Sequence, residues 1–260
     1  MFIIKIGGSV ITDKAKENSF KKNVIDNLAK QIKKSNKEII FVHGAGSFGH
    51  IIAKKYNLDQ GYKNKNQLYG FSITHAMVQR LNSLVLNSLH EINIPAVSLP
   101  PHNIMKLKNH KLSSFNYNIF GDYIEIGITP VTFGDVVLDE KLGFSICSGD
   151  LLMQILSEYF KPEKAIFIID EDGLYTSNPK INKNAEFINS TTIEKIKKLK
   201  FAANKHDDVT GGMGGKIQTI KNITKLGIDT VLLNGNKPDR LFKVLVGEET
   251  KSTTIYGVKK

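Results

Sequence analysis

Short, continuously apolar runs alternate along the chain with longer stretches in which apolar residues recur every three or four positions. The runs have the length of strands and lie at residues 2–6, 39–42, 96–99, 129–133, 136–138, 165–169, 230–233 and near 254–256. The periodic stretches predict helices over residues 22–35, about 67–91, after 150, from the 211–215 turn through 226, and over 240–246. Apolar strands separated by helices are typical of a mostly parallel sheet covered on both faces, so we predict a single α/β domain over residues 1–260.

Composition and charge limit the kinds of molecule that the protein is expected to bind. The chain has 260 residues, of which 41% are hydrophobic and 23% charged, and this excludes a disordered chain. Its formal charge is +11, but all of its 36 basic residues except Arg80 and Arg240 are lysine. Proteins that read bases or clamp phosphates bidentately favour arginine, so we attribute most of the charge to a solvated surface and expect no nucleic-acid partner.

The single cysteine and the lack of long apolar runs indicate the cellular compartment of the protein. Cys147 has no second cysteine with which to form an internal disulfide, and this fits a reducing compartment. No apolar run approaches the ~18 residues of a membrane span. The N-terminal apolar segment is interrupted by Lys5 and is too short for a signal peptide. We therefore expect a cytoplasmic protein without a membrane partner.

Glycine-rich turns that follow predicted strands carry the candidate chemistry. Gly44-x-Gly46-x-x-Gly49 matches the fingerprint of a dinucleotide-binding turn. The acidic residue that such a site needs about 20 positions later is absent, because residues 63–67 are rich in lysine and asparagine. Tight packing of a strand against a helix is the alternative explanation for any one turn, whereas several turns in one domain favour a ligand site.

Two further glycine turns are flanked by lysines. Gly211-Gly212-Met213-Gly214-Gly215-Lys216 differs from a Walker A sequence, because positions 210 and 217 hold Thr and Ile. Its glycines and its lysine at a helix start nevertheless suit an anion. Gly7-Gly8-Ser9, between Lys5 and Lys14, has the same character. Phosphoryl transfer depends on positioning and on neutralising charge, so these turns predict a phosphotransferase.

Four motifs, in this order, resemble those of the amino acid kinase superfamily. They are Lys5-Ile6-Gly7-Gly8-Ser9, Ser148-Gly149-Asp150, Asp170-Glu171-Asp172-Gly173-Leu174-Tyr175 and Asp208-Val209-Thr210-Gly211-Gly212-Met213-x-Gly215-Lys216. Within the superfamily, His43-Gly44-Ala45-Gly46-Ser47-Phe48-Gly49-His50 resembles the isopentenyl phosphate kinase family and the related fosfomycin kinases.

This resemblance spans nearly the whole chain and implies a fold and an activity. The implied fold is a three-layer αβα sandwich with a central mostly parallel sheet, and the implied assembly is a homodimer. The implied reaction converts isopentenyl phosphate to isopentenyl diphosphate with ATP and Mg²⁺, in an archaeal-type mevalonate route. The N-terminal part would bind the acceptor and the C-terminal part the nucleotide.

The resemblance also implies roles for single residues. The predicted catalytic residues are Lys5, Lys14, Asp150 and Lys216, with the lysines on the phosphates and Asp150 pairing with Lys5 and Lys216 instead of acting as a base. The predicted acceptor-binding residues are Gly44, Ala45, His50 and Gly149. The predicted nucleotide-side residues are Lys5, Gly7, Gly8, Ser9, Gly46, Asp170, Tyr175, Gly212 and Lys216, and no residue is assigned as a protein ligand of a metal. A candidate prenyl pocket, chosen by position, contains Phe71, Ile73 and Met77.

Each assignment has a simpler alternative. Lys14 is otherwise a solvated loop lysine, His50 a histidine that caps its turn, and Asp150 an ordinary helix cap. The sequence also departs from the family pattern, with Ile51 where proline is frequent and Ile169 where threonine is common. The alternative functions are a related kinase, such as a fosfomycin kinase, or a nucleotide-binding sensor without catalysis.

Overall fold

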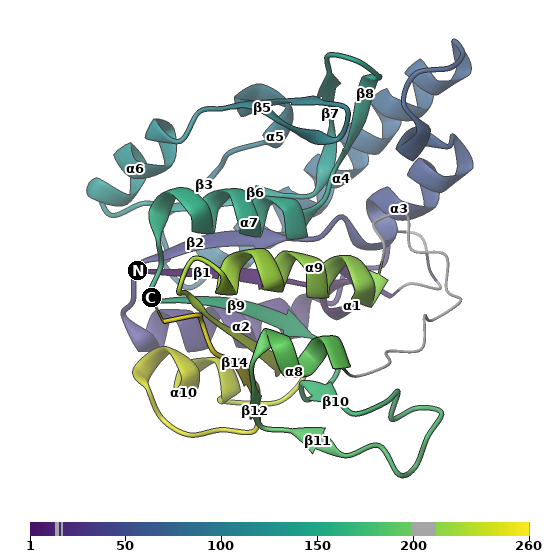
Figure 1. Ribbon diagram of the computed structural model, residues 1–260. Coiled ribbons are helices and arrows are strands. Elements are labelled where there is room, and N and C mark those ends of the chain that lie inside the picture. The colour runs from purple at the N-terminus through teal and green to yellow at the C-terminus, as the bar shows by residue number, and fades with distance from the viewer. Residues whose placement is uncertain (14–15, 17, 199–211, 260) are drawn as a thin grey trace.

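The computed structural model describes residues 1–13, 16, 18–198 and 212–259, so Lys14 lies outside the described residues. The elements in chain order are β1(Phe2–Ile6), α1(Gly8–Ile11), α2(Lys22–Ser35), β2(Ile39–His43), α3(Gly46–Lys55), the 3-10 helix η1(Leu58–Gln60), α4(Asn66–His90), β3(Ala96–Ser98), α5(Pro101–Ile104), β4(Met105–Lys108), β5(Lys111–Phe115), α6(Asn118–Glu125), β6(Thr129–Phe133), β7(Asp135–Asp139), β8(Gly143–Cys147), α7(Gly149–Phe160), β9(Lys164–Ile169), β10(Leu174–Tyr175), β11(Phe187–Ile188), β12(Ser190–Thr191), α8(Ile193–Lys198), α9(Gly212–Thr224), β13(Asp229–Asn234), α10(Arg240–Val246) and β14(Thr253–Ile255) (Figure 1).

An eight-stranded central sheet organises the fold. Its strands lie in the order β12-β14-β13-β9-β1-β2-β6-β3. Each adjacent pair is parallel except β13 with β14. The six strands from β13 to β3 therefore run in one direction, and their carboxyl ends form one edge. The predicted mostly parallel sheet is confirmed.

Side chains of the central strands point alternately to two apolar clusters, one on each face of the sheet. On one face, Ile3 belongs to a cluster that includes Leu152 of α7 and Ile220 of α9. On the other face, Ile4 belongs to a cluster that includes Leu28 of α2, together with residues of α4 and α10. Helices thus cover both faces, and the predicted three-layer αβα sandwich is confirmed (Figure 1).

A second sheet, with strands in the order β5-β4-β7-β8, was only partly predicted. The predicted strand at residues 136–138 lies within β7, whereas β4, β5 and β8 were not predicted. In β4, Met105 and Leu107 are buried while Lys106 and Lys108 are exposed. This alternation over four residues is the pattern of a half-solvated sheet, and it is too short to stand out in the sequence.

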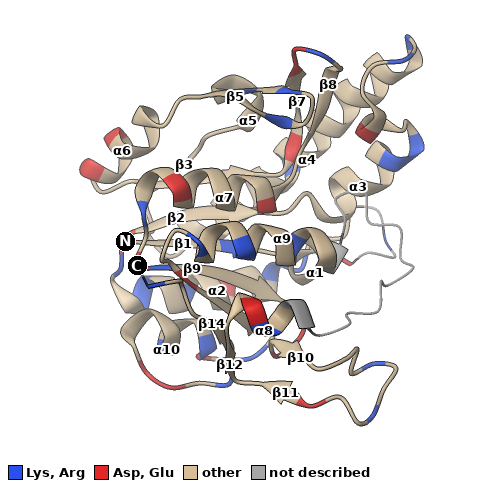
Figure 2. Cartoon of the chain, in the orientation of Figure 1, with Lys and Arg blue, Asp and Glu red and all other residues tan. Residues whose placement is uncertain are grey.

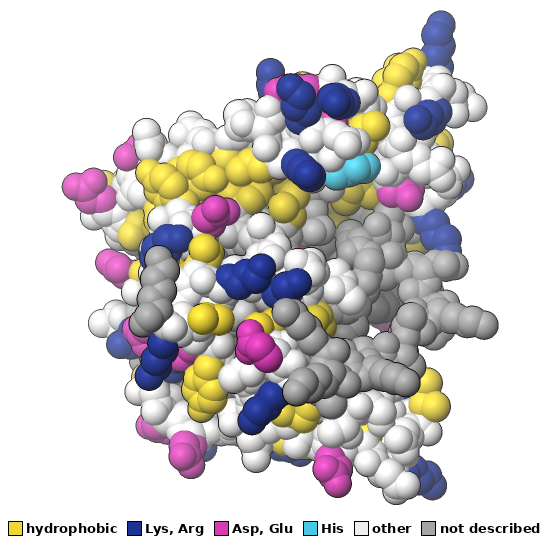
Figure 3. Space-filling view, in the orientation of Figure 1, with side chains coloured by type: hydrophobic (Ala, Val, Ile, Leu, Met, Phe, Trp, Pro, Cys, Tyr) yellow, Lys and Arg dark blue, Asp and Glu magenta, His cyan; other side chains and the backbone are white. Residues whose placement is uncertain are grey.

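The surface charge is dispersed. Lys and Arg residues occur on elements throughout the chain (Figure 2), and on the face shown in Figure 3 their side chains lie among uncharged and acidic groups. This distribution agrees with the interpretation of the excess lysine as solvated surface. None of the described helices is long and apolar enough to cross a membrane.

Candidate active site

Four glycines at the carboxyl edge of the central sheet each extend the hydrogen-bond ladder by one residue. Each donates its backbone N–H to a carbonyl of the neighbouring strand, at N···O distances of 2.9 to 3.0 Å, and the pairs are Gly7–Ile168, Gly44–Ile6, Gly134–His43 and Gly235–Ile169. Ligands of parallel sheets bind at this edge. The edge is therefore lined by backbone without side chains, where a phosphate can approach closely.

Two of the predicted glycine turns touch each other through their backbones. A Cβ atom on Gly8 would lie 2.6 Å from the backbone N and Cα of Gly46. A Cβ atom on Gly44 would lie 2.7 Å from the backbone N of Gly8. Gly46 also has a positive φ of 52°, a conformation that favours glycine. The structure thus brings the nucleotide-side and acceptor-side turns into direct contact.

Thr12 joins these turns and was not predicted. Its buried hydroxyl donates a hydrogen bond to the carbonyl of Gly8 at 2.7 Å and accepts one from the N–H of Ser47 at 3.0 Å. One side chain therefore holds α1 to the start of α3. The available signal was its place one turn after Gly8, because a hydroxyl there can reach back to a backbone carbonyl.

Lys5, Asp150 and Lys216 meet at the same edge. Lys5 lies on the face of β1 that Ile3 occupies, which directs it toward α7 and α9. Lys5 Nζ is 2.8 Å from Asp150 Oδ1, and Lys216 Nζ is 3.3 Å from Oδ1 and 3.5 Å from Oδ2. Lys5 and Asp150 are only 7% and 8% exposed. Two positive charges around one negative charge leave the cluster attractive to an anion.

The pKa values of Asp150 and Lys216 reflect the close packing of these three charged groups. Burial by itself raises the pKa of Asp150, but the charges of Lys5 and Lys216 outweigh it and lower that pKa to about 2. Burial and the charge of Lys5 lower the pKa of Lys216 to about 8, against the attraction of Asp150. The ring of Phe167 lies under both ammonium groups, with Nζ of Lys5 and Lys216 at 6.0 and 5.4 Å from its centroid. Asp150 therefore stays charged at neutral pH and serves as the anchor of two cations.

Asp150 is not the cap of its helix. Ser148 is the N-cap of α7, and its Oγ accepts a hydrogen bond from the N–H of Leu151 at 3.1 Å. The simpler explanation for Asp150 is thereby removed, because the capping position is filled by another residue.

Residues predicted for the acceptor phosphate lie beside the lysines. A Cβ atom on Gly149 would lie 2.9 Å from Cε of Lys5 and 3.3 Å from the carbonyl oxygen of His43. A Cβ atom on Gly134 would lie 3.1 Å from the backbone N of Gly149 and 3.7 Å from that of Ala45. The starts of α3 and α7 thus approach each other, and N–H groups at helix starts attract anions.

His50 lies farther along α3 and is half-buried. Beyond it, the helix borders a small apolar cluster that is separate from the two large ones. The members of this small cluster are Ala53, Tyr56, Leu58, Phe71, Val136, Phe144 and Ile146. Of the residues predicted for a prenyl pocket, Phe71 lies here, whereas Met77 packs against the cluster under α2 and α4, and Ile73 is half-buried. The structure therefore separates Phe71 from Met77.

The remaining predicted nucleotide-side residues lie in α1, after β9, in β10 and at the start of α9. Asp170 is exposed directly after β9, and Ser9 is half-buried in α1. The ring of Tyr175 in β10 lies 5.3 Å from that of Phe187. Gly212 is the first residue of α9, so Gly212, Gly214 and Gly215, which were predicted to form a turn, belong to the first turns of the helix, and Gly211 lies outside the described residues. Unpaired N–H groups of a helix start are donors for a phosphate.

Asp172 anchors the loop after β9, and this network was not predicted. Its carboxylate accepts hydrogen bonds from Arg240 at 2.7 Å and Asn234 at 3.2 Å, and it pairs with Lys251 at 2.8 Å. Burial opposes ionisation of Asp172, but the hydrogen bonds from Lys251 and Arg240 outweigh it and lower the pKa to about 2. The acidic motif that begins at Asp170 thus contains a structural carboxylate next to the exposed one.

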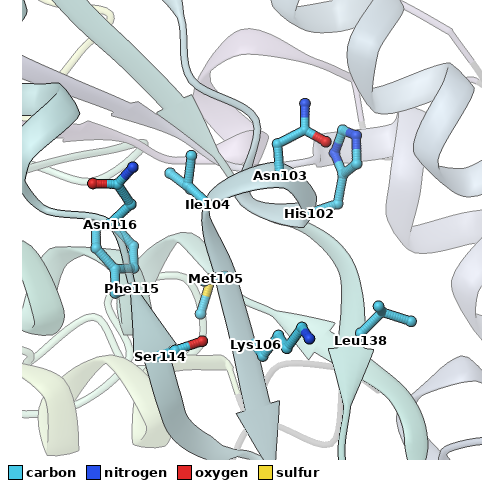
Figure 4. Close-up of a pocket in the computed structure, with 9 residues that line it drawn as sticks. All are labelled: His102, Asn103, Ile104, Met105, Lys106, Ser114, Phe115, Asn116 and Leu138. Atoms are coloured by element: carbon cyan, nitrogen blue, oxygen red, sulfur yellow. The ribbon is translucent and has the colours of Figure 1, made fainter.

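A groove of about 330 Å³ lies away from the glycine edge, between α5, β4, β5 and β7 (Figure 4). Its lining residues are His102, Asn103, Ile104, Met105, Lys106, Ser114, Phe115, Asn116 and Leu138. None of the predicted site residues is among them. The groove and the glycine-lined edge are therefore different features.

Comparison with known proteins places the chain in a family. The model of the amino acid kinase family matches residues 1–234. Isopentenyl phosphate kinase of Methanothermobacter thermautotrophicus is 36% identical over 99% of both chains, and that of Thermoplasma acidophilum is 34% identical over 98% of this chain and 99% of the relative. A solved structure of isopentenyl phosphate kinase superposes with a TM-score of 0.86 at 33% identity, covering 98% of this chain and 99% of the other.

Proposed function

The chain belongs to the amino acid kinase family, and from that premise we propose that it transfers the terminal phosphoryl group of ATP to isopentenyl phosphate, forming isopentenyl diphosphate and ADP. The observation that carries the proposal is the position of α3 between two chemically different surroundings. Its first residue, Gly46, touches the phosphate-binding turn at Gly8, and Ala53 belongs to the small apolar cluster. Seven helical residues span about 10 Å, the scale of a phosphate attached to a five-carbon chain.

The lysine cluster provides the electrostatic part of the reaction. Lys5 and Lys216 lie where they can stabilise charge on the transferred group, and the glycine turn that begins at Gly7 directly follows the strand of Lys5. Asp150 keeps both ammonium groups in place. A general base is not required, since a phosphate monoester with a second pKa near 6 already offers an anionic oxygen at neutral pH. We propose that His50 hydrogen-bonds the acceptor phosphate and that Lys14 contacts the transferred phosphoryl group.

Mg²⁺ neutralises charge on the ATP phosphates when it is bound. Both oxygens of Asp150 are engaged, with Lys216 within 3.5 Å of each and Lys5 2.8 Å from Oδ1. Because the lysines already occupy the carboxylate of Asp150, the site fits an ion that arrives with the nucleotide and is held by its phosphate oxygens. It does not fit an ion resident on Asp150.

The proposal is tested by measuring ADP release from ATP and Mg²⁺ with four acceptors: isopentenyl phosphate, dimethylallyl phosphate, fosfomycin and acetylglutamate. We expect the highest kcat/KM with isopentenyl phosphate and a diphosphate product in the mass spectrum. A preference for fosfomycin would assign the chain to the related kinases. Nucleotide binding without ADP release for any acceptor would identify a sensor.

We also propose that the chain forms a homodimer through an apolar band between α6 and α7. Figure 3 shows hydrophobic side chains gathered there. Tyr159 is 52% exposed, and its ring stacks on that of Tyr117 at 4.1 Å. Large exposed apolar patches mark association surfaces. Light scattering should therefore give a dimer mass for the natural chain and a monomer mass for Tyr159→Glu; equal masses for both would contradict this surface.

A further inference from the structure

Three side chains from separate elements converge at a point that the proposed reaction does not use. His75 comes from α4, His102 from α5, and Asp135 is the first residue of β7. Nδ1 of His75 is 2.8 Å from Asp135 Oδ2, and Nδ1 of His102 is 3.6 Å from the same oxygen. The two imidazole rings have centroids 3.9 Å apart. One carboxylate oxygen therefore faces two ring nitrogens.

Hydrogen bonding within the cluster leaves one of these nitrogens unsatisfied. The carboxylate of Asp135 is fully buried, and its other oxygen already accepts a hydrogen bond from the N–H of Val136 at 2.8 Å. Nδ1 of His102 is buried and has no hydrogen-bond partner. Leaving a buried polar atom without a hydrogen bond is unfavourable, so a native structure needs a reason to keep it.

The spacing of the donor atoms matches metal coordination. In a tetrahedral zinc site, bonds of about 2.0–2.1 Å place ligand atoms about 3.4 Å apart. One candidate donor atom from each of the three residues lies within 4.8 Å of those of the other two, and the distances of 2.8 and 3.6 Å to Asp135 Oδ2 lie on either side of the ideal. Small side-chain rotations would equalise them. An ion at this point would also satisfy Nδ1 of His102.

We propose that His75, His102 and Asp135 form a binding site for a divalent transition-metal cation, of which Zn²⁺ is the reference case. Two imidazoles and one carboxylate are the donors that Zn²⁺ and Co²⁺ accept, whereas Mg²⁺ and Ca²⁺ prefer oxygen ligands alone. The imidazole side chains are 26% and 28% exposed, so solvent reaches the cluster and can supply a fourth ligand. The site is thus distinct from the Mg²⁺ that accompanies ATP.

The place of the cluster suggests what the ion does. Asp135 directly follows Gly134, which packs between the backbones of Ala45 and Gly149. His102 and Asn103 lie side by side on α5 at one end of the groove in Figure 4. A metal ion would link α4 and α5 to the strand start that backs the acceptor turn. Its expected effect is to stabilise this part of the fold, because an ion that binds only the native state shifts folding toward it.

The test uses the full, untagged chain, stripped of metal by chelation and free of nucleotide, so that its outcome is independent of phosphoryl transfer. Calorimetric titration with Zn²⁺ should show one ion per chain, and Co²⁺ should give the intense visible absorption of a four-coordinate ion. Zn²⁺ should also raise the Tm. His102→Ala and Asp135→Asn should each weaken binding by about tenfold or more and remove the Tm shift.

His90→Ala is the matched control, because His90 is an exposed histidine at the end of α4 outside the cluster. It should bind Zn²⁺ like the natural chain. The partly exposed His102 tolerates truncation, so His102→Ala decides the question even where Asp135→Asn fails to fold. No uptake by the natural chain, or unchanged uptake by folded His102→Ala, would overturn the proposal.

Discussion

Asp150 is the residue on which the charge balance of the site depends. Without its negative charge, Lys5 and Lys216 would face each other as buried like charges, since both ammonium groups lie within 3.5 Å of its oxygens. Breaking a buried ion pair by removing one partner costs about 3–5 kcal/mol. Asp150→Asn keeps the shape and removes the charge, so we expect a fall of that order in the free energy of unfolding, measured with urea, and a large fall in kcat.

A structural role for Asp150 alone would give a different result. Asp150→Asn would then lose stability but keep the kcat of its folded fraction at a temperature well below its Tm. The fall in kcat under those conditions therefore separates the two roles.

The lowered pKa of Lys216 predicts how enzyme activity decreases at alkaline pH. Its pKa of about 8 lies below the ordinary lysine value of 10.5, because burial and the charge of Lys5 disfavour its charged form. The protonated form that binds phosphate is thus lost as pH rises through about 8. Since kcat/KM reports the free enzyme, kcat/KM for ATP should fall above that pH. Arginine keeps its charge to a much higher pH than lysine. The activity that Lys216→Arg retains should therefore show no decrease in kcat/KM above about pH 8. An unchanged decrease in Lys216→Arg would assign it to another group.

Residue-level chemistry was predictable only where a motif surrounds the residue. Lys5 and Lys216 adjoin glycine turns, and the family resemblance placed Asp150 between them, although Asp150 lies 145 and 66 positions from the two lysines. Thr12 and Arg240 act through hydrogen bonds to Ser47 and Asp172, which are distant in the sequence, and a local pattern does not reveal such partners. The histidines and the aspartate of the proposed metal site come from three elements, and only the packing brings them together.

At the scale of elements, the contact between α1 and α3 depends on missing side chains. A methyl group on Gly8 would lie 2.6 Å from the backbone of Gly46, and the nearby Gly7 and Gly44 are held in the ladder at the sheet edge. We expect Gly8→Ala to lower the free energy of unfolding by about 1–3 kcal/mol, the cost of overpacking, and to reduce kcat strongly.

Gly121 is the matched control for this substitution. It lies inside α6, where a Cβ atom would meet nothing within 4 Å. Gly121→Ala should leave kcat unchanged and stabilise the chain by about 0.5–1 kcal/mol, since alanine is the better helix former. Equal effects of the two substitutions, measured by urea unfolding and steady-state kinetics, would contradict the close contact at Gly8.

Elements were predictable where their burial is uniform. β1, β2, β9 and β13 are almost completely buried and read as continuous apolar runs. β5 is exposed over most of its length and offers no such run. Its pairing with β4 depends on register and turn geometry instead, which a hydrophobic pattern does not record.

At the scale of the whole molecule, three separated carboxylates resist protonation because hydrogen-bond donors or cations surround each of them. Asp139 accepts hydrogen bonds from the backbone N–H groups of Asn109, His110, Lys141 and Leu142. These bonds outweigh the effect of burial and lower the pKa of Asp139. Asp150 and Asp172 reach pKa values of about 2 through cationic partners. The three sites lie in the second sheet, at α7 and in the loop after β9, so acid acts on all parts of the fold together.

A carboxyl group with a lowered pKa in the folded state stabilises the fold above its ordinary pKa and loses that effect as pH falls toward the folded value. The free energy of unfolding should therefore stay level down to about pH 5 and fall steeply between about pH 4 and 2. The fall in the pKa of Asp172 from 3.8 to about 2 corresponds to about 2–3 kcal/mol, and its side chain is only 18% exposed. Asp172→Asn should start lower at neutral pH and lose less on acidification, as measured by urea unfolding at each pH. The net charge is +11 in the natural chain and differs by only one charge in Asp172→Asn, so self-repulsion is nearly the same in both and the difference between their curves reports Asp172. Parallel curves would mean that Asp172 has the same pKa in the folded and unfolded states.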